Sequence, residues 1–163
     1  IRIHIISNKM TTCNSCKSLK LKQIINLGKT PLANAYTEKL KDFKYEKKFP
    51  LVVKFCKKCK LIQAPHNIKP NKIFIKYDYL SGISKMWINH CKNFYDTVIK
   101  KFRFSPKKDQ IIEIASNDGT LLNFFKKKKF NCIGIEPSKY AANISRNKNK
   151  IKTINDFLTP KLS

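Results

Sequence analysis

Two Cys-x-x-Cys motifs require distant parts of this chain to meet. The first is Cys13-Asn14-Ser15-Cys16 and the second is Cys56-Lys57-Lys58-Cys59, with 39 residues between the two motifs. Two thiolates at this spacing can chelate one ion from a single turn, and two such turns complete the closed tetrahedral shell that Zn²⁺ prefers. We therefore predict a structural Zn²⁺ site formed by four residues, Cys13, Cys16, Cys56 and Cys59. Its metal should contribute folding free energy on the order of 10 kcal/mol.

The separation of the two motifs leaves other interpretations open. A simple zinc ribbon has about 15 to 20 residues between its knuckles, so the intervening segment must carry structure of its own. It contains a turn-rich stretch, Leu27–Asn34, and a strand over 49–55 that leads into Cys56. A disulfide framework and a redox motif are the weaker alternatives, because the chain shows no secretion signal. Cys91 and Cys132 belong to no Cys-x-x-Cys motif and are expected to be buried thiols.

The segment Ile111–Gly119 reads as an apolar strand followed by a tight polar turn, and Thr120 opens a helical pattern. A second apolar run, Asn131–Ile135, ends in Glu136. In open α/β sheets ligands bind beyond the carboxyl ends of the strands, and an acid after the second strand is a common partner of ribose hydroxyls. One glycine replaces the three of the dinucleotide fingerprint, which favours a nucleoside without phosphates such as S-adenosylmethionine. The alternative is an ordinary turn.

The high positive charge suggests a nucleic-acid partner, but the type and distribution of the basic residues weaken that suggestion. The formal net charge is +25, but only three of the 35 basic residues are arginine and the lysines are spread from end to end. The same sequence is rich in Lys, Ile, Asn and Phe, as A/T-rich codons would produce. We therefore regard a nucleic-acid surface as the less favoured interpretation.

Length and patterning indicate a globular protein with several segments. Residues 1–9 are read as an upstream extension before Met10, 10–70 as the zinc-binding domain, 71–105 as a helical connector and 106–163 as a nucleotide-binding α/β segment. The connector carries a helix from Lys85 to about Phe102, on which Trp87 and Phe94 are expected to pack in the core. No apolar run approaches the roughly 20 residues of a membrane span, and a cytoplasmic location is expected.

The motifs, taken in order, resemble those of the sugar C-methyltransferase family. The resemblance rests on seven motifs: Cys13-x-x-Cys16; Leu27-Gly28-x-x-Pro31-Leu32-Ala33-Asn34; Pro50-Leu51; Cys56-x-x-Cys59-x-Leu61-x-Gln63; Tyr77-x-Tyr79-x-Ser81; Glu113-x-x-Ser116-Asn117-Asp118-Gly119; and Gly134-x-Glu136-Pro137. It runs from Met10 to the end of the chain. The family implies an α+β zinc-binding N-terminal domain followed by an α/β Rossmann-like class I methyltransferase domain, of which this chain would hold the first part.

The resemblance also implies roles for residues that match the motifs. The turn Ser116–Gly119 would pass beneath the methionine and ribose parts of S-adenosylmethionine, and Glu136 would accept hydrogen bonds from the ribose hydroxyls. Asp156 and Phe157, after a third strand over Lys152–Ile154, would border the adenine. The full cofactor-binding set is Ser81, Ser84, Glu113, Ser116, Asn117, Asp118, Gly119, Glu136, Pro137, Asp156 and Phe157. Tyr77 and Tyr79 would line the pocket where a nucleotide-linked sugar meets the cofactor, and are the catalytic candidates.

The family's chemistry requires groups that this sequence does not supply. Its substrates are keto-deoxysugars, whose acidic α C–H must be removed before carbon can accept a methyl group, so a general base is needed. In the family that base is a His in a later part of the sheet, and neither His66 nor His90 matches its position. We therefore expect a fragment without turnover, of unknown oligomeric state. The alternative from a different class is a stand-alone basic zinc module that binds nucleic acid or protein.

Overall fold

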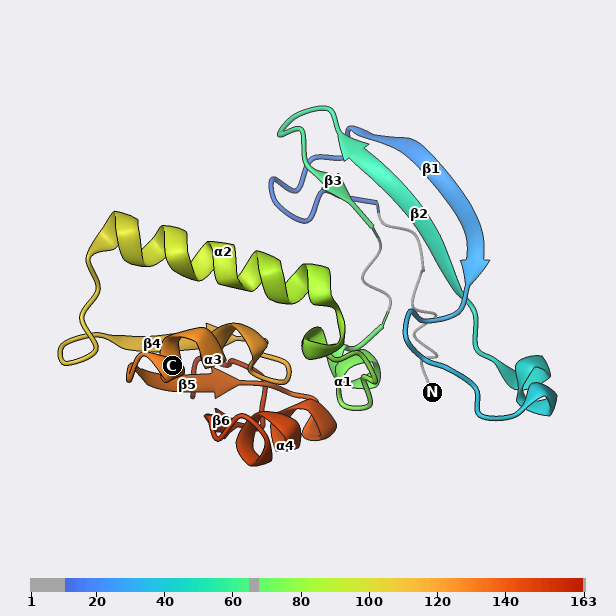
Figure 1. The fold of residues 1–163 in the computed structure, drawn as a ribbon. Helices are drawn as coiled ribbons and strands as arrows, with labels where there is room; N and C mark the ends of the chain where they lie inside the picture. Colours follow the sequence, from blue (N-terminus) through green and yellow to red (C-terminus); the bar gives the residue numbers. More distant parts are fainter. Residues whose placement is uncertain (1–10, 65–67, 163) are drawn as a thin grey trace. The chain divides into compact units, whose positions relative to one another are not determined.

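The structure is a computed structural model that describes residues 11–64 and 68–162. The chain divides into two compact units, Ile1–Lys69 and Pro70–Ser163, and each is described here by itself. The elements of both units are labelled in Figure 1. The expected extension at residues 1–9, together with Met10 and His66, lies outside the described residues.

The first unit is built on an antiparallel sheet of three strands. Strands β1 (Leu21–Thr30), β2 (Phe49–Cys56) and β3 (Ile62–Gln63) lie in the order β1-β2-β3 (Figure 1). Leu21 pairs with Cys56, so the start of β1 lies beside the end of β2. The long connection between these strands contains a 3₁₀ helix, η1 (Leu40–Tyr45). The pairing of β1 with β2 therefore brings the segments that carry the two Cys-x-x-Cys motifs to the same end of the sheet.

The prediction of a turn-rich stretch over Leu27–Asn34 is wrong for its first four residues, which belong to β1. Gly28 has φ +70°, and the register shifts between Asn26 and Lys29. A glycine takes this left-handed conformation at little cost, so a bulge absorbs the extra residues and the strand continues. Turn structure begins only after Thr30, where Asn34 also has a positive φ of 59°.

The second unit contains three parallel strands joined by helices. After α1 (Pro70–Phe74), the 3₁₀ helix η2 (Ser81–Ile83) and α2 (Lys85–Phe102), the chain forms β4 (Gln110–Ile114), α3 (Thr120–Lys127), β5 (Asn131–Ile135), α4 (Lys139–Asn147) and β6 (Lys152–Ile154). The strand order is β4-β5-β6. Ile114 pairs with Ile135, which pairs with Ile154, so the three carboxyl ends are aligned. All three strands were expected from the sequence; helix α4 was not.

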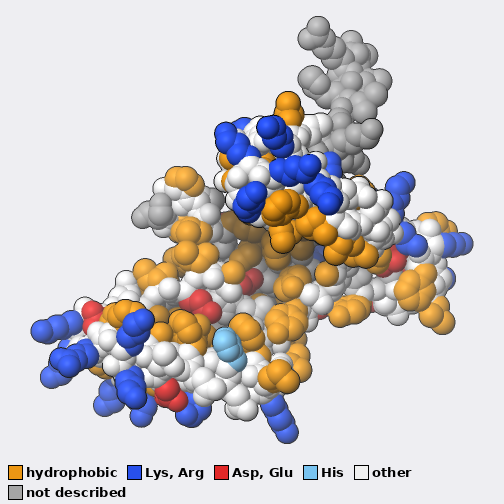
Figure 2. Space-filling view, turned by 90° about the horizontal axis from the view of Figure 1, so that it is seen from above, with side chains coloured by type: hydrophobic (Ala, Val, Ile, Leu, Met, Phe, Trp, Pro, Cys, Tyr) orange, Lys and Arg blue, Asp and Glu red, His pale blue; other side chains and the backbone are white. Residues whose placement is uncertain are grey.

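One face of this sheet holds the core and the other face is open. Buried side chains of α3 and β5 form the centre of the core with Ile151, and α2 packs beside α3; the buried cluster is Leu122, Phe125, Phe130, Cys132 and Ile151. On the opposite face of β4, Ile112 and Ile114 are 56% and 58% exposed. Figure 2 shows hydrophobic side chains on the visible surface as well. Cys91 and Cys132 are both buried, as predicted.

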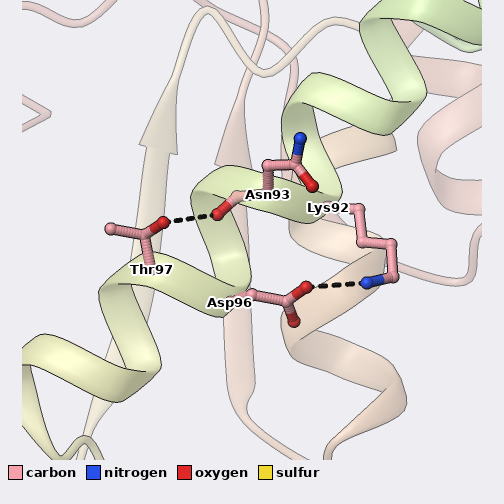
Figure 3. Close-up of polar contacts among 4 residues, drawn as sticks. All are labelled: Lys92, Asn93, Asp96 and Thr97. Atoms are coloured by element: carbon pink, nitrogen blue, oxygen red, sulfur yellow. Dashed lines mark hydrogen bonds and ion pairs between the residues drawn. The ribbon is translucent and has the colours of Figure 1, made fainter.

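Helix α2 spans the predicted residues, but the face predicted to be buried is not the face that packs. Ser84 caps its N-terminus by accepting a hydrogen bond from the Trp87 N–H. The face that packs carries Cys91, Tyr95 and Val98, at helical spacing, whereas Trp87 and Phe94 are 44% and 47% exposed. On the outer surface Lys92 pairs with Asp96 at 2.7 Å and the Thr97 hydroxyl donates to the Asn93 carbonyl (Figure 3).

Within residues 11–64 and 68–162, no helix combines the length and the apolar character needed to cross a membrane.

Two glycines with the same left-handed backbone provide a matched test of the packing in the second unit. A Cβ at Gly119 (φ +77°) would lie 2.7 Å from both Ile151 Cδ1 and Ser145 Oγ, whereas a Cβ at Gly28 (φ +70°) meets no atom within 4 Å. We expect Gly119→Ala to destabilise its unit by roughly 2 to 4 kcal/mol, from strain and overpacking together, and Gly28→Ala by only about 1 kcal/mol. Denaturant unfolding of each variant measures this, and equal losses would contradict the packing described.

Candidate functional site

The four cysteines of the two motifs come together in the first unit. Their Sγ atoms all lie within 4.8 Å of one another. Cys13 Sγ is 3.5 Å from Cys59 Sγ, and Cys16 Sγ is 3.6 Å from Cys56 Sγ. A disulfide would need about 2.05 Å, whereas a tetrahedral Zn²⁺ with Zn–S bonds of about 2.3 Å separates its sulfurs by roughly 3.8 Å. The sulfur positions therefore fit Zn²⁺ and do not fit a disulfide.

The two motifs adopt the same backbone conformation. Lys17 and Lys60, each directly after the second cysteine of its motif, have φ values of 58° and 67°. The ammonium group of each lysine also donates a hydrogen bond to a carbonyl of its own loop: Lys17 to Asn14 O at 3.0 Å, and Lys60 to Lys57 O at 2.9 Å. The repeated conformation presents two sulfurs from each loop toward a common point.

Two thiols of this site, those of Cys56 and Cys59, have pKa values shifted in opposite directions. The backbone N–H of Cys59 is the main cause that lowers the pKa of Cys56 to about 6. The Leu61 N–H lowers the pKa of Cys59, but desolvation and the neighbouring cysteines outweigh it and raise that pKa to about 11. Four thiolates this close together repel one another, so a divalent cation is needed to hold all four deprotonated.

The turn between β4 and α3 uses three left-handed residues in five. Ala115, Asn117 and Gly119 have φ values of 57°, 49° and 77°. This conformation is uncommon for residues other than glycine, and here hydrogen bonds hold it in place. Asn117 Oδ1 accepts from the Ser81 N–H at 2.9 Å, and its Nδ2 donates to the Tyr79 carbonyl at 3.0 Å.

Asp118 forms a second attachment between this turn and the segment before α2. Its Oδ2 accepts from the Gly82 N–H at 2.7 Å, and its Oδ1 accepts from the Thr120 hydroxyl at 2.6 Å. Asp118 is only 4% exposed. Its carboxylate therefore holds the segment Tyr79–Gly82 against the turn.

Glu136 joins the ends of β4 and β5. Oε2 accepts from the Asn117 N–H at 2.8 Å, and Oε1 accepts from the Ser138 N–H at 2.7 Å. The residue is 5% exposed. Each carboxylate oxygen has two lone pairs, so each retains the capacity to accept one further hydrogen bond.

A cavity of about 240 Å³ lies at the carboxyl ends of the three strands. Six residues of the predicted site line it: Asn117, Glu136, Pro137, Asp156 and Phe157 from the cofactor-binding set, and Tyr77, one of the two catalytic candidates. Its remaining lining is apolar and comes from Phe74, Ile114, Ala115, Ile135 and Leu158. The cavity thus combines a mostly apolar wall with the acid that ends β5.

The other predicted residues do not line this cavity. Ser81, Asp118 and Gly119 support the turn as described above, Ser84 caps α2, and Tyr79 offers its backbone carbonyl. Ser116 is 3% exposed, and its Oγ occupies the space that Gly134 leaves on β5. Glu113 lies in β4 on the same face as Ile111, which packs on the core.

Sequence reasoning missed the apolar residues of the cavity. Ile114 and Ile135 are the last residues of β4 and β5, so their position at the strand ends was an available signal. Phe74 ends α1, far from the turn in sequence, and no local pattern identifies it.

Glu113 is a buried carboxyl group whose Oε2 has no hydrogen-bond partner among the described residues. Burial is the main cause that raises its pKa to about 7, with a smaller contribution from the charges of Asp118 and Glu136. A carboxyl group in this environment is stabilised in its protonated, neutral form.

Two comparisons with known proteins bear on this chain. A family model described as "Putative zinc binding domain" matches residues 13–74. The chain is also similar to the C-methyltransferase NovU of Streptomyces niveus, with 26% identity over 136 residues, which cover 83% of this chain and 32% of that protein. The chain thus spans about a third of the length of that relative. These matches confirm the resemblance to the sugar C-methyltransferase family.

Metal content tests the cysteine site. We expect one Zn²⁺ per chain and a large loss of structure in the first unit on chelation, because the metal supplies on the order of 10 kcal/mol. Cys16→Ser should abolish stoichiometric binding, whereas Cys91→Ser, a change of the same kind in the second unit, should retain it. Metal analysis together with the visible absorption of Co²⁺-substituted protein measures both. Equal metal loss in the two variants would argue against the site.

The pH dependence of stability tests Glu113. Because its pKa in the folded state is raised to about 7 from 4.5, the folded state binds the proton more tightly than the unfolded state. Its stabilisation is complete below about pH 4.5 and is lost as pH rises through about 7, by roughly 3 kcal/mol at most. Glu113→Gln should remove this fall in the free energy of unfolding between pH 5 and 8. The exposed-site control Asp96→Asn should leave it intact, and an unchanged pH profile in Glu113→Gln would refute the assignment.

Proposed function

Starting from this resemblance, we propose that the chain forms the zinc-binding and cofactor-binding part of an S-adenosylmethionine-dependent C-methyltransferase. The proposed substrate is a nucleotide-linked keto-deoxysugar. Because the chain spans about a third of its relative, the activity is proposed for a protein that includes this chain, and the 163 residues alone are expected to show no turnover.

The observation that carries the proposal is the cavity at the carboxyl ends of β4, β5 and β6. Three parallel strands in the order β4-β5-β6, joined by helices, match the connectivity of half of a Rossmann-like sheet. Ligands of such sheets bind at this edge. An acid at the end of the second strand and an apolar wall for a base are the features that an adenosine requires, and Glu136 and Phe157 supply them.

The residues of the cavity have separable tasks in this proposal. Glu136 is fixed by two backbone N–H groups and would accept the ribose hydroxyls through its remaining lone pairs. Asp156 and Phe157 would border the adenine. Asp156 Oδ1 already accepts the Phe157 N–H at 2.7 Å, so its Oδ2 remains the oxygen available to an adenine amino group. Tyr77 lines the cavity beside Glu136 and is the nearer of the two tyrosines to the proposed cofactor.

The bound cofactor would supply the methyl group. The residues of this chain contribute positioning, which is worth several kcal/mol when two bound molecules must align. We assign no general base among the described residues. His90 lies on the exposed surface of α2, where its ring is 5.2 Å from that of Trp87, and it is not among the residues that line the cavity.

The zinc centre has a structural task in this proposal, because four sulfur ligands leave no position for water or substrate. Reduced cysteines of this kind suit a cytoplasmic enzyme, which is the proposed location. The nucleic-acid module is the less supported function, since the similarity to a methyltransferase extends over 83% of the chain.

Two isoleucines on one strand give a matched test of the cofactor site. Ile112 and Ile114 lie on the same face of β4 with nearly equal exposure, but only Ile114 lines the cavity. We expect Ile114→Trp to weaken S-adenosylmethionine binding at least tenfold by filling the cavity, and Ile112→Trp to change it less than twofold. NMR titration of the 163-residue chain measures this, because it detects weak binding and reports on Glu136 and Phe157 directly.

Two further results would decide the proposal. Glu136→Ala should abolish the cofactor-induced shifts, with thermal unfolding as a control because this carboxylate also holds the turn. The absence of any shift at the cavity of the folded wild-type chain, at millimolar cofactor, would overturn the assignment. For the activity, a longer protein that includes this chain should add one methyl group to a nucleotide-linked keto-deoxysugar, as mass spectrometry would show.

A further inference from the structure

The surface beside the zinc site contains a hollow of about 580 Å³ with an unusual lining. Its residues are Cys16, Lys17, Ser18, Lys20, Lys57 and Lys58. No acidic and no aromatic side chain is among them. The hollow is therefore lined by four lysines, one serine hydroxyl and one sulfur of the metal site.

The four lysines of this hollow carry more positive charge than is required to balance the negative charge of the zinc–thiolate centre. A Zn²⁺ with four thiolates carries a net charge of −2, whereas the four lysines of the lining carry +4. Within the described residues the ion pair found is Lys92–Asp96 in the other unit, so no carboxylate pairs with these four lysines. A surplus of about two positive charges is left to attract an anion. At physiological salt this attraction extends over a Debye length of about 8 Å.

The backbone holds the two halves of the hollow together. Lys17 and Lys20 come from the segment of the first motif, and Lys57 and Lys58 lie inside the second. The Lys57 N–H donates to the Lys20 carbonyl at 2.9 Å, and the Lys20 N–H donates to Ser18 Oγ at 3.1 Å. The metal site and these bonds fix where the lysine side chains begin, so a ligand does not need to order the loops.

We propose that this lysine-lined hollow is a binding site for a diphosphate group. Lysine ammonium groups bind phosphate as point charges, and two pairs of them from two loops suit a ligand with two linked phosphates. The absence of an aromatic residue from the lining argues against single-stranded nucleic acid, which is bound by stacking of its bases. The inference rests on the proposed function only for one source of the diphosphate, the nucleotide-linked substrate; the alternative source is free pyrophosphate.

The test uses inorganic pyrophosphate and two double variants that remove the same charge. Lys57→Ala/Lys58→Ala alters the hollow, whereas Lys47→Ala/Lys48→Ala removes two consecutive exposed lysines of the same unit that do not line it. With zinc-loaded protein at physiological salt, we expect the first double variant to weaken pyrophosphate binding at least tenfold and the second less than twofold. No saturable binding to the wild type, or equal weakening in both variants, would overturn the proposal.

Two competitors identify the source of the group. A nucleoside diphosphate that displaces pyrophosphate at equal or lower concentration supports a nucleotide-linked ligand, and one that requires tenfold more supports free pyrophosphate. A twelve-nucleotide single strand that binds more than a hundredfold tighter through the same lysines would replace the proposal with a nucleic-acid site. The cofactor-induced shifts occur in the other unit, so failure here and failure of the methyltransferase proposal are separate results.

Discussion

The second unit depends on one carboxylate, that of Glu136, which accepts backbone N–H groups from both sides of its own position. The bond to Asn117 fixes the turn after β4, and the bond to Ser138 fixes the start of α4. A nearly buried carboxylate has lost most of its contact with water, and these donors satisfy its oxygens instead. Because Asn117 in turn holds Tyr79 and Ser81, Glu136 supports both the turn after β4 and the segment before α2 through one chain of hydrogen bonds.

The sequence was sufficient wherever a short-range pattern determines the structure. The apolar runs at 111–114 and 131–135 and the third strand at 152–154 are strands in the structure, as short runs bounded by turn residues predict. The four cysteines were identified as one site because each CxxC turn can present two sulfurs to one ion. Both features follow from local geometry.

The errors and omissions have a different physical origin. A helical stripe that contains Trp87 and Phe94 looks like a core face, but packing against α3 selects the neighbouring face through Cys91, Tyr95 and Val98. Strand β1 continues through a glycine because its partner β2 provides hydrogen bonds on the far side of the bulge. The hydrogen bond from the Gly82 N–H to Asp118, which joins residues 36 apart in sequence, was not foreseen. Each of these outcomes is decided by a partner that is distant in sequence.

The pairing of Leu21 with Cys56 couples the metal to the sheet. In a flexible chain the closure of a long loop costs entropy before any metal can be bound, and here the hairpin of β1 and β2 has already closed it. Hairpin formation and zinc binding therefore share one thermodynamic cycle, in which each raises the equilibrium constant of the other by the same factor. The apparent affinity for zinc therefore reports the stability of the pairing between β1 and β2. A substitution at Val52, paired with Asn26 in the middle of the hairpin, would register in a metal titration although it touches no ligand.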